Sequence, residues 1–146
     1  MKNALVTTDR QPPQQPVTAN PPRALLIESD QDSRELMKFI LETKGFNVLA
    51  IEDGEQFLAL RDELPPDLII INVLMPVDKD FGILRQIRQQ ASLHNVPTIV
   101  TSIYPNSIVR SESLRAKCLA FFAKPIDFDK LNDLIEEFLS RHSNGH

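Results

Sequence analysis

The stretch of sequence that decides the fold is DLIIINVLMP, residues 67 to 76. It contains a short, continuous apolar run, Leu68 to Ile71, which ends on the polar amide Asn72. An apolar run of this length, rich in β-branched side chains, is typical of a strand that is buried on both faces, as the strands of a parallel sheet are. We therefore predict a buried strand over Leu68–Asn72.

Similar apolar segments recur along the chain, and an amphipathic stretch of helical length separates each from the next. The predicted strands are Ala24–Glu28, Asn47–Ile51, Leu68–Asn72, Thr98–Thr101 and Cys118–Phe122. The predicted helices lie at about Gln31–Lys44, Gly54–Glu63, Phe81–Gln90 and Ser107–Ala116, and a last helix carries the apolar stripe Leu131, Leu134, Ile135 and Phe138. This alternation predicts an α/β fold whose parallel sheet is covered on both faces.

Local signals mark the ends of the first two helices. Asp30 is a predicted N-cap, and Gly45 is placed to end the first helix as a C′ glycine. Pro65 and Pro66 end the second helix, because the residue that precedes a proline disfavours helix. The side chains that we expect the first helix to direct inward are Leu36, Met37, Ile40 and Leu41.

Residues 1–22 differ in composition from the rest, with five prolines among Gln, Thr and Asn. Such a segment cannot bury enough apolar surface to offset the entropy of ordering, so we expect a disordered or extended Pro/Gln-rich arm. A proline-rich docking site is the alternative, although no clear PxxP ligand with flanking basic residues exists beyond Pro13–Pro16. We place the folded domain at residues 23–141 and a flexible tail at residues 142–146.

Composition excludes several classes of protein. The 146 residues, 42% hydrophobic and 25% charged, fit one domain of about 120 residues plus a tail. A net charge of -4 and a pI near 5.3 argue against nucleic-acid binding, which needs a basic patch. The single cysteine, Cys118, excludes an internal disulfide and favours a reducing compartment, and its simplest role is a core thiol. No apolar run approaches the roughly 18 residues of a membrane span, so we expect a cytoplasmic protein.

Four polar side chains end or follow predicted strands: Glu28, Asn72, Thr101 and Lys124. The carboxyl ends of parallel strands meet at one edge of a sheet, and ligands bind there near the point where the strand order reverses. One polar residue at a strand end is more simply the start of a solvated loop. The joint placement of four predicts a site at this edge.

Four segments carry a resemblance to a known family: ALLIESDQDSRELM (24–37), NVLMP (72–76), VPTIVTS (96–102) and FFAKPI (121–126). Over residues 23–141 the chain resembles the CheY-like receiver domain of response regulators. The resemblance implies a flavodoxin-like, doubly wound (βα)5 fold with a five-stranded parallel sheet in the order 2-1-3-4-5. It also implies a signalling module of a two-component or phosphorelay system, which is not an enzyme.

The resemblance assigns a family position to each residue of the predicted site. Glu28 and Ser29 stand at the acidic pair, Asn72 at the phosphate-accepting aspartate, Thr101 at the hydroxyl that contacts the phosphoryl group, Phe121 at the switch aromatic and Lys124 at the lysine. Arg34 follows the pair as usual in the family. The resemblance further implies that the Lys124–Pro125 peptide bond is cis.

The departures from the family concern the chemistry itself. Receivers hold Mg²⁺ with the acidic pair and the acceptor carboxylate. In this chain Ser29 and Asn72 stand at two of these three acidic positions, so the site has two fewer negative charges, while it keeps the positive charge of Lys124. We therefore expect Mg²⁺ binding to be weak or absent and no other cofactor. The neutral amide of Asn72 is far too weak a nucleophile to replace a carboxylate as phosphate acceptor.

A displaced carboxylate could still contribute to a metal site. Asp30, Asp78 and Asp80 are the candidates, and the loop that holds the last two has drifted, with Lys79 where the family often has Asp. Capping and solvent exposure explain all three more simply. We expect instead a hydrogen bond or an ion pair from Lys124 to Glu28 or Asn72, which holds the site in one conformation without phosphate.

The sequence thus predicts a pseudo-receiver, a stand-alone module that acts by protein–protein interaction independently of phosphorylation. Its expected partner is a histidine kinase or an output protein, or a second copy in a homodimer, bound through the face from the fourth strand to the last helix. Ile103, Tyr104 and Ile108 form either an exposed apolar patch there or part of the core. For Thr101 and Phe121, a role in a conformational switch and simple packing at the strand ends are equally compatible with the sequence.

Two other functions stay open. The first is a response regulator that accepts phosphate from a histidine kinase at a non-standard site, although none of Ser29, Thr101 or Ser102 suits that chemistry. The second is a small-molecule binder that uses the crevice of the fold. The chain has only four glycines and no glycine-rich phosphate loop, which weighs against a nucleotide or a flavin.

Overall fold

The computed structural model describes residues 21–54, 56–57, 65–73, 78–90, 92–103 and 107–144. Within these residues, five parallel strands form one sheet in the order β2-β1-β3-β4-β5. The strands are β1 Arg23–Ile27, β2 Asn47–Ile51, β3 Leu68–Asn72, β4 Thr98–Ser102 and β5 Ala120–Ala123. This order and the crossover helices confirm the flavodoxin-like, doubly wound α/β fold.

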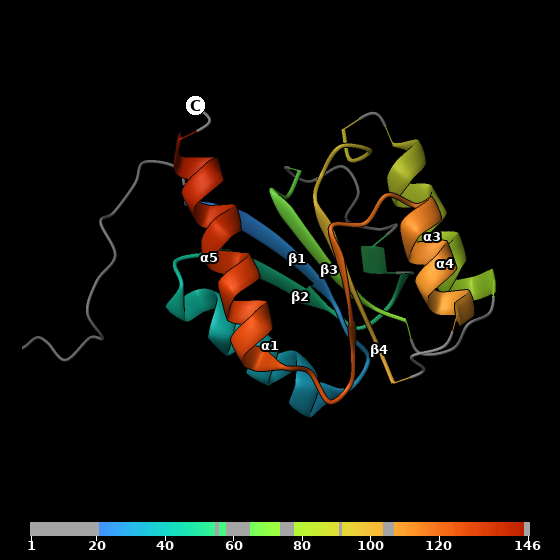
Figure 1. Cartoon of the computed structure of the whole chain (residues 1–146), viewed down its shortest axis with the longest axis horizontal. Helices are drawn as coiled ribbons and strands as arrows, with labels where there is room; N and C mark the ends of the chain where they lie inside the picture. The colour runs from blue at the N-terminus through green and yellow to red at the C-terminus, as the bar shows by residue number, and fades with distance from the viewer. Residues whose placement is uncertain are drawn as a thin grey trace, which may run out of the picture.

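Helices cover both faces of the sheet (Figure 1). The helices with assigned bounds are α1 Gln31–Thr43, α3 Asp78–Gln89, α4 Ser107–Arg115 and α5 Phe128–Asn144. Figure 1 shows α1 and α5 on one face and α3 and α4 on the other. Gly54, Gln56 and Phe57 are helical, and the rest of the predicted helix Gly54–Glu63 lies outside the described residues.

The apolar strands are continuous in sequence because both faces of the sheet are buried. Along β3, Leu68 and Ile70 belong to the cluster under α1 and α5, whereas Ile69 and Ile71 belong to the cluster on the α3 side. Successive side chains of a strand point to opposite faces, so a strand between two helical layers needs an apolar residue at every position.

Helix α1 begins and ends where the local signals predict. Asp30 is its N-cap, since one carboxylate oxygen accepts a hydrogen bond of 2.8 Å from the Ser33 N–H. Gly45 has a φ of 99°, and its N–H donates to the Glu42 carbonyl while the Phe46 N–H donates to the Leu41 carbonyl. These two bonds form a Schellman motif, which requires the left-handed residue that glycine supplies.

The inward face of α1 is narrower than the sequence predicts. Met37 and Leu41 are buried and Ile40 is half-buried, but Leu36 is 49% exposed, so its predicted inward orientation is wrong. Residues four apart share one face of a helix, whereas adjacent residues are about 100° apart. The pair Met37 and Leu41 sets the buried face, and Leu36 lies beside it.

The boundaries of β5, α3 and β4 differ from the prediction. The predicted strand begins at Cys118, but the chain is still turning there: Lys117 has a φ of 57°, and the Cys118 N–H donates to the Ser113 carbonyl. Pairing with β4 begins when the Leu119 N–H donates to the Thr98 carbonyl. Similarly, α3 begins at Asp78 rather than Phe81, and β4 extends to Ser102.

The ends of the domain differ in part from the prediction. Residues 1–20 of the predicted arm 1–22 lie outside the described residues, and the Pro22 carbonyl already accepts a hydrogen bond from the Asn47 N–H. Helix α5 continues to Asn144, so residues 142–144 are helical where the sequence places the start of the tail. The predicted stripe of α5 faces the sheet, with Leu131 and Ile135 buried and Leu134 and Phe138 half-buried.

Cys118 behaves as the expected core thiol. It is half-buried and packs against the cluster on the α3 side, and burial raises the pKa of its thiol. Among the residues that the structure describes, no helix is long and apolar enough to cross a membrane.

Candidate functional site

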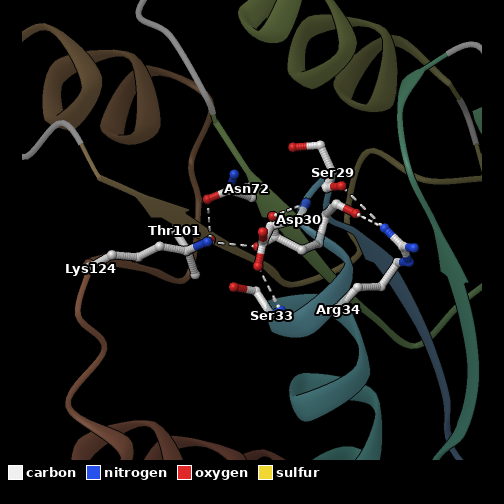
Figure 2. Close-up of polar contacts among 8 residues, drawn as sticks. Ser29, Asp30, Ser33, Arg34, Asn72, Thr101 and Lys124 are labelled. Carbon is white, nitrogen blue, oxygen red and sulfur yellow. Dashed lines mark hydrogen bonds and ion pairs between the residues drawn. The ribbon is translucent and has the colours of Figure 1, made fainter.

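The carboxyl ends of β1, β3 and β4 and the loop after β5 converge at one edge of the sheet. Glu28 directly follows β1, Asn72 ends β3, Thr101 lies in β4 and Lys124 directly follows β5. Figure 2 shows Asn72, Thr101 and Lys124 pointing toward one another, with Ser29 and Asp30 beside them. The parallel register sets this arrangement, since Asn72 stands opposite Thr101 in the β3–β4 pair.

Lys124 and Glu28 form an ion pair, so of the two partners that the sequence predicts for Lys124, Glu28 and Asn72, the structure shows Glu28. The lysine Nζ lies 2.8 Å from Glu28 Oε1, and the two side chains are only 17% and 5% exposed. The other carboxylate oxygen, Oε2, accepts a hydrogen bond of 3.0 Å from the Asp30 N–H. Both oxygens of the only buried carboxylate at this edge, among the described residues, therefore already have partners.

The backbone holds both ends of this ion pair in place. The Glu28 N–H donates to the Ile51 carbonyl of β2, and the Lys124 N–H donates to the Ser102 carbonyl of β4. The Lys124–Pro125 peptide bond is cis, as the resemblance implies. The pair thus connects the ends of β1 and β5, which are not neighbours in the sheet.

Asn72 is paired with Thr101. The threonine Oγ1 donates to Asn72 Oδ1 at 3.1 Å, and Thr101 is 2% exposed. The Val73 N–H donates to the Thr101 carbonyl and so keeps the two strand ends together. The amide oxygen that occupies the family's acceptor position is therefore held by a buried hydroxyl.

Ser29 and Asp30 lie on the solvent side of the site. Both are exposed, and the Arg34 guanidinium holds the backbone before Asp30 by donating from Nη1 to the carbonyls of Glu28 at 2.9 Å and Ser29 at 3.3 Å. The Asp30 carboxylate caps α1. This arrangement commits Asp30 to the helix rather than to the cluster around Lys124.

The hydrogen bonds that cap α1 lower the pKa of Asp30 below its ordinary value of 3.8. The Ser33 hydroxyl makes the largest contribution and the Ser33 N–H the next, while the charges of Lys124 and Arg34 add less. Because the folded pKa is depressed, the stability that this cap gives is present above the unfolded pKa and is lost as the pH falls through the folded pKa.

We predict that Ser33→Ala raises the pKa of Asp30 toward 3.8, because it removes the hydroxyl contribution and leaves the N–H bond in place. The measurement is an NMR titration of the Asp30 carboxyl carbon in the two proteins. Ser140→Ala, at an exposed position of α5, is the matched control and should leave the titration of Asp30 unchanged. An equal pKa in wild type and Ser33→Ala would contradict the assigned cause.

The described side chains do not fit a magnesium ion. Mg²⁺ demands near-octahedral oxygen coordination and is usually held by one or two carboxylates. This edge offers the Glu28 carboxylate, which Lys124 and the Asp30 N–H already occupy, the Ser29 hydroxyl and the Asn72 amide. No group of three His, Cys, Asp or Glu side chains placed to hold a metal ion occurs within the described residues. The side chains of Asp78 and Asp80 lie outside them.

The switch-type aromatic Phe121 has a contact that the sequence did not predict. It is half-buried, and the guanidinium carbon of Arg110 in α4 lies 5.2 Å from the ring centroid, a distance at which a cation and an aromatic ring attract. No local pattern indicates this pair, because it joins a helix to the following strand. Of the predicted apolar patch, Ile103 is 53% exposed, and the side chains of Tyr104 and Ile108 lie outside the described residues.

Comparisons with known proteins agree with this geometry. Residues 24–136 match the response regulator receiver domain. The transcriptional regulatory protein CpxR of Klebsiella pneumoniae subsp. pneumoniae is 32% identical over 119 residues, which cover 82% of this chain and 50% of CpxR. This chain thus spans about half the length of that relative.

Solved receiver domains share the fold. The signal receiver domain of a histidine kinase from Clostridium thermocellum superposes with a TM-score of 0.73 at 26% identity, covering 81% of this chain and 97% of that domain. The corresponding domain from Syntrophus aciditrophicus gives a TM-score of 0.70 at 27% identity, covering 82% of this chain and 90% of that one.

Proposed function

We propose that this chain, which belongs to the response regulator receiver domain family, signals through protein contacts without phosphorylation at position 72. Receiver domains are signalling modules of two-component systems, in which they interact with histidine kinases or output domains. The finer proposal for this chain is a pseudo-receiver, with the family's fold and partners but without its phosphate chemistry.

The observation that carries the proposal is the amide of Asn72 at the acceptor position. An aspartyl phosphate forms when a carboxylate oxygen attacks phosphorus, and an amide oxygen bears no negative charge for that attack. Here the oxygen also accepts a hydrogen bond from the Thr101 hydroxyl. Position 72 therefore lacks the nucleophile, and one lone pair of its amide oxygen is already engaged.

The Lys124–Glu28 ion pair supports the second half of the proposal, a site held in one conformation. The lysine charge is already neutralised by Glu28 at 2.8 Å, so it needs no phosphoryl group as a partner. We propose that Mg²⁺ binds weakly or not at all, because a metal ion would have to displace Lys124 from the carboxylate.

The proposed contact surface is the face formed by α4, β5 and α5, where receiver domains commonly pair. Ile103, which directly follows β4, exposes 53% of its surface and is the described member of the predicted apolar patch. The partner is a histidine kinase, an output protein or a second copy of the chain. The proposed location, the cytoplasm, follows from this signalling role.

The alternative function is phosphate acceptance at a non-standard site. The exposed hydroxyl of Ser29 lies beside the site, whereas the exposed carboxylate of Asp30 is engaged in capping α1. A serine hydroxyl without an adjacent general base is a weak nucleophile. We therefore treat this alternative as an outcome to be tested.

Intact-mass spectrometry after incubation with acetyl phosphate and Mg²⁺ separates the two functions. The expected result is no phosphoryl adduct on the wild-type protein under conditions that fully phosphorylate a receiver domain with its aspartate intact. An adduct that hydroxylamine removes would mean an acyl phosphate on a carboxylate. An adduct resistant to hydroxylamine and lost in Ser29→Ala would place it on the serine. Either adduct would overturn the proposal.

A further inference from the structure

A pocket lies at the opposite edge of the sheet from the candidate site. It has a volume of about 360 Å³, and the residues that line it come from the starts of three strands and from the second half of α5. Asp67, Pro97 and Leu119 directly precede β3, β4 and β5, respectively. The lining residues from α5 are Leu134, Glu137, Phe138, Arg141 and His142.

Two of the side chains that line this pocket, Phe138 and His142, belong to a row of stacked rings. Phe138 stacks on Phe46 with a centroid distance of 5.9 Å, and His142 stacks on Phe138 at 5.5 Å. Leu119 is 45% exposed at the pocket. The Glu137–Arg141 ion pair, with an Nη2–Oε2 distance of 2.6 Å, forms part of the rim. The pocket is therefore an apolar, aromatic-lined groove with a charged rim.

The chain enters the fold beside this pocket. The Arg23 N–H, at the start of β1, donates to the Asp67 carboxylate at 2.8 Å, and Asp67 lines the pocket. The Asp67 N–H in turn donates to the Arg23 carbonyl. Arg23, near the point where the described part of the chain begins, is thus hydrogen-bonded to a residue that lines the pocket.

The sequence of this arm suits an aromatic-lined groove. Residues 11 to 17 read QPPQQPV, and proline-rich segments adopt the preformed polyproline II helix that docks in such grooves at low entropic cost. From Leu134 to His142, α5 extends about 12 Å, at 1.5 Å per residue. About four residues of polyproline II, at 3.1 Å each, match this length.

We propose that the proline-rich segment at residues 11–17 of this chain docks in the pocket formed by Leu119, Phe138 and their neighbours. The five residue-to-residue steps from Val17 to Pro22 span about 15 Å in polyproline II, which is the length of chain that connects the segment to the start of β1. A short tether gives an effective concentration in the millimolar range, which favours the chain's own arm over a free peptide or a second copy. The inference does not depend on the proposed function.

Paramagnetic relaxation enhancement in the full chain tests this proposal. A nitroxide is attached at Gln15→Cys in a Cys118→Ser background, and amide signals are compared before and after reduction of the label. We expect the amides of Leu134, Phe138 and His142 to lose most of their intensity, while those of α3 keep theirs. Uniform weak losses, or losses centred elsewhere, would overturn the proposal.

Matched variants identify the groove and the chemistry. Leu119→Lys should abolish the signal loss, whereas Leu36→Lys, at a leucine of similar exposure on α1, should leave it unchanged. Replacing Pro12, Pro13 and Pro16 together with glycine should also abolish it, because the preformed helix is lost. Persistence of the loss in the pocket variant or the glycine variant would contradict docking of a polyproline segment.

A mixed sample separates the chain's own arm from that of a second copy. Isotope-labelled protein without nitroxide is combined with unlabelled protein that carries it, so only contacts between molecules cause signal loss. We expect no loss at α5 in this sample. A loss equal to that of the single species would mean that the occupant comes from another molecule, and the proposal would be wrong.

Discussion

Replacing Lys124 with methionine is expected to lower the free energy of unfolding by about 3 kcal/mol. Glu28 and Lys124 lie 2.8 Å apart with side chains that are 5% and 17% exposed, so the substitution leaves a buried carboxylate with only the Asp30 N–H as a partner. Removing one member of a buried ion pair is costly because the remaining charge is no longer compensated. Urea denaturation measures the change.

The matched control for this substitution is Lys38→Met. Lys38 also pairs with a glutamate at 2.8 Å, but its side chain and that of Glu42 are 42% and 46% exposed. Exposed pairs four residues apart on a helix contribute about 0.3–0.5 kcal/mol. If Lys124→Met costs no more than Lys38→Met, the Lys124–Glu28 pair is not sequestered from water, and it does not hold the site in one conformation.

A double-mutant cycle separates the pair from the packing of its side chains. Glu28→Gln removes the buried charge while keeping a hydrogen-bond acceptor for the Asp30 N–H. If the cost of Lys124→Met comes from the unpaired carboxylate, the combined variant should recover most of the lost stability. Additive costs would mean that each side chain contributes through packing alone.

The fold was predictable because a strand that is buried on both faces of the sheet has a continuous apolar sequence. The run Leu68–Ile71 supplies both core clusters by simple alternation, so periodicity and composition sufficed to place β3. The strand order came from the resemblance alone. Where the prediction was wrong, as for Leu36, the sequence showed an apolar helix position but not which neighbours fixed the buried face.

The sequence was sufficient to predict which residues form the candidate site, but it did not predict all of the contacts between them. Parallel strands bring their carboxyl ends together, which placed Glu28, Asn72, Thr101 and Lys124 at one edge before any contact was known. The second partner of Glu28, the Asp30 N–H, depends on the path of one loop. The Arg110–Phe121 contact depends on how α4 packs against β5. Neither leaves a periodic pattern in the sequence.

Restoring the two missing acids is expected to restore the family's chemistry. The variant Ser29→Asp plus Asn72→Asp adds one carboxylate next to Glu28 in the chain and another at the end of β3, which pairs with β1 up to Ile27 and Ile71. We expect it to bind Mg²⁺ and, with acetyl phosphate, to gain a hydroxylamine-sensitive adduct that the wild type lacks. Asn72→Asp alone should gain less, because its metal site still lacks an acid at position 29.

The matched control carries the same change in charge away from the site. Asn132→Asp plus Ser140→Asp, at exposed positions of α5, should gain neither Mg²⁺ binding nor an adduct. If both double variants stay unmodified, Asn72 and Ser29 are not what separates this chain from an active receiver, and the start of α3, with Lys79 and Asp80, becomes the next place to restore.

Thermal unfolding gives an independent measure of the restored site. Without Mg²⁺, the variant Ser29→Asp plus Asn72→Asp should be less stable than the wild type, because carboxylates that share a site repel one another. Saturating Mg²⁺ should reverse this loss, since a ligand at 100 times its Kd stabilises the folded state by about 2.7 kcal/mol. The wild type should show no such response, because Lys124 already occupies the place of the cation beside Glu28. A wild-type protein stabilised by Mg²⁺ as strongly as the variant would mean that the metal site survived the loss of both acids.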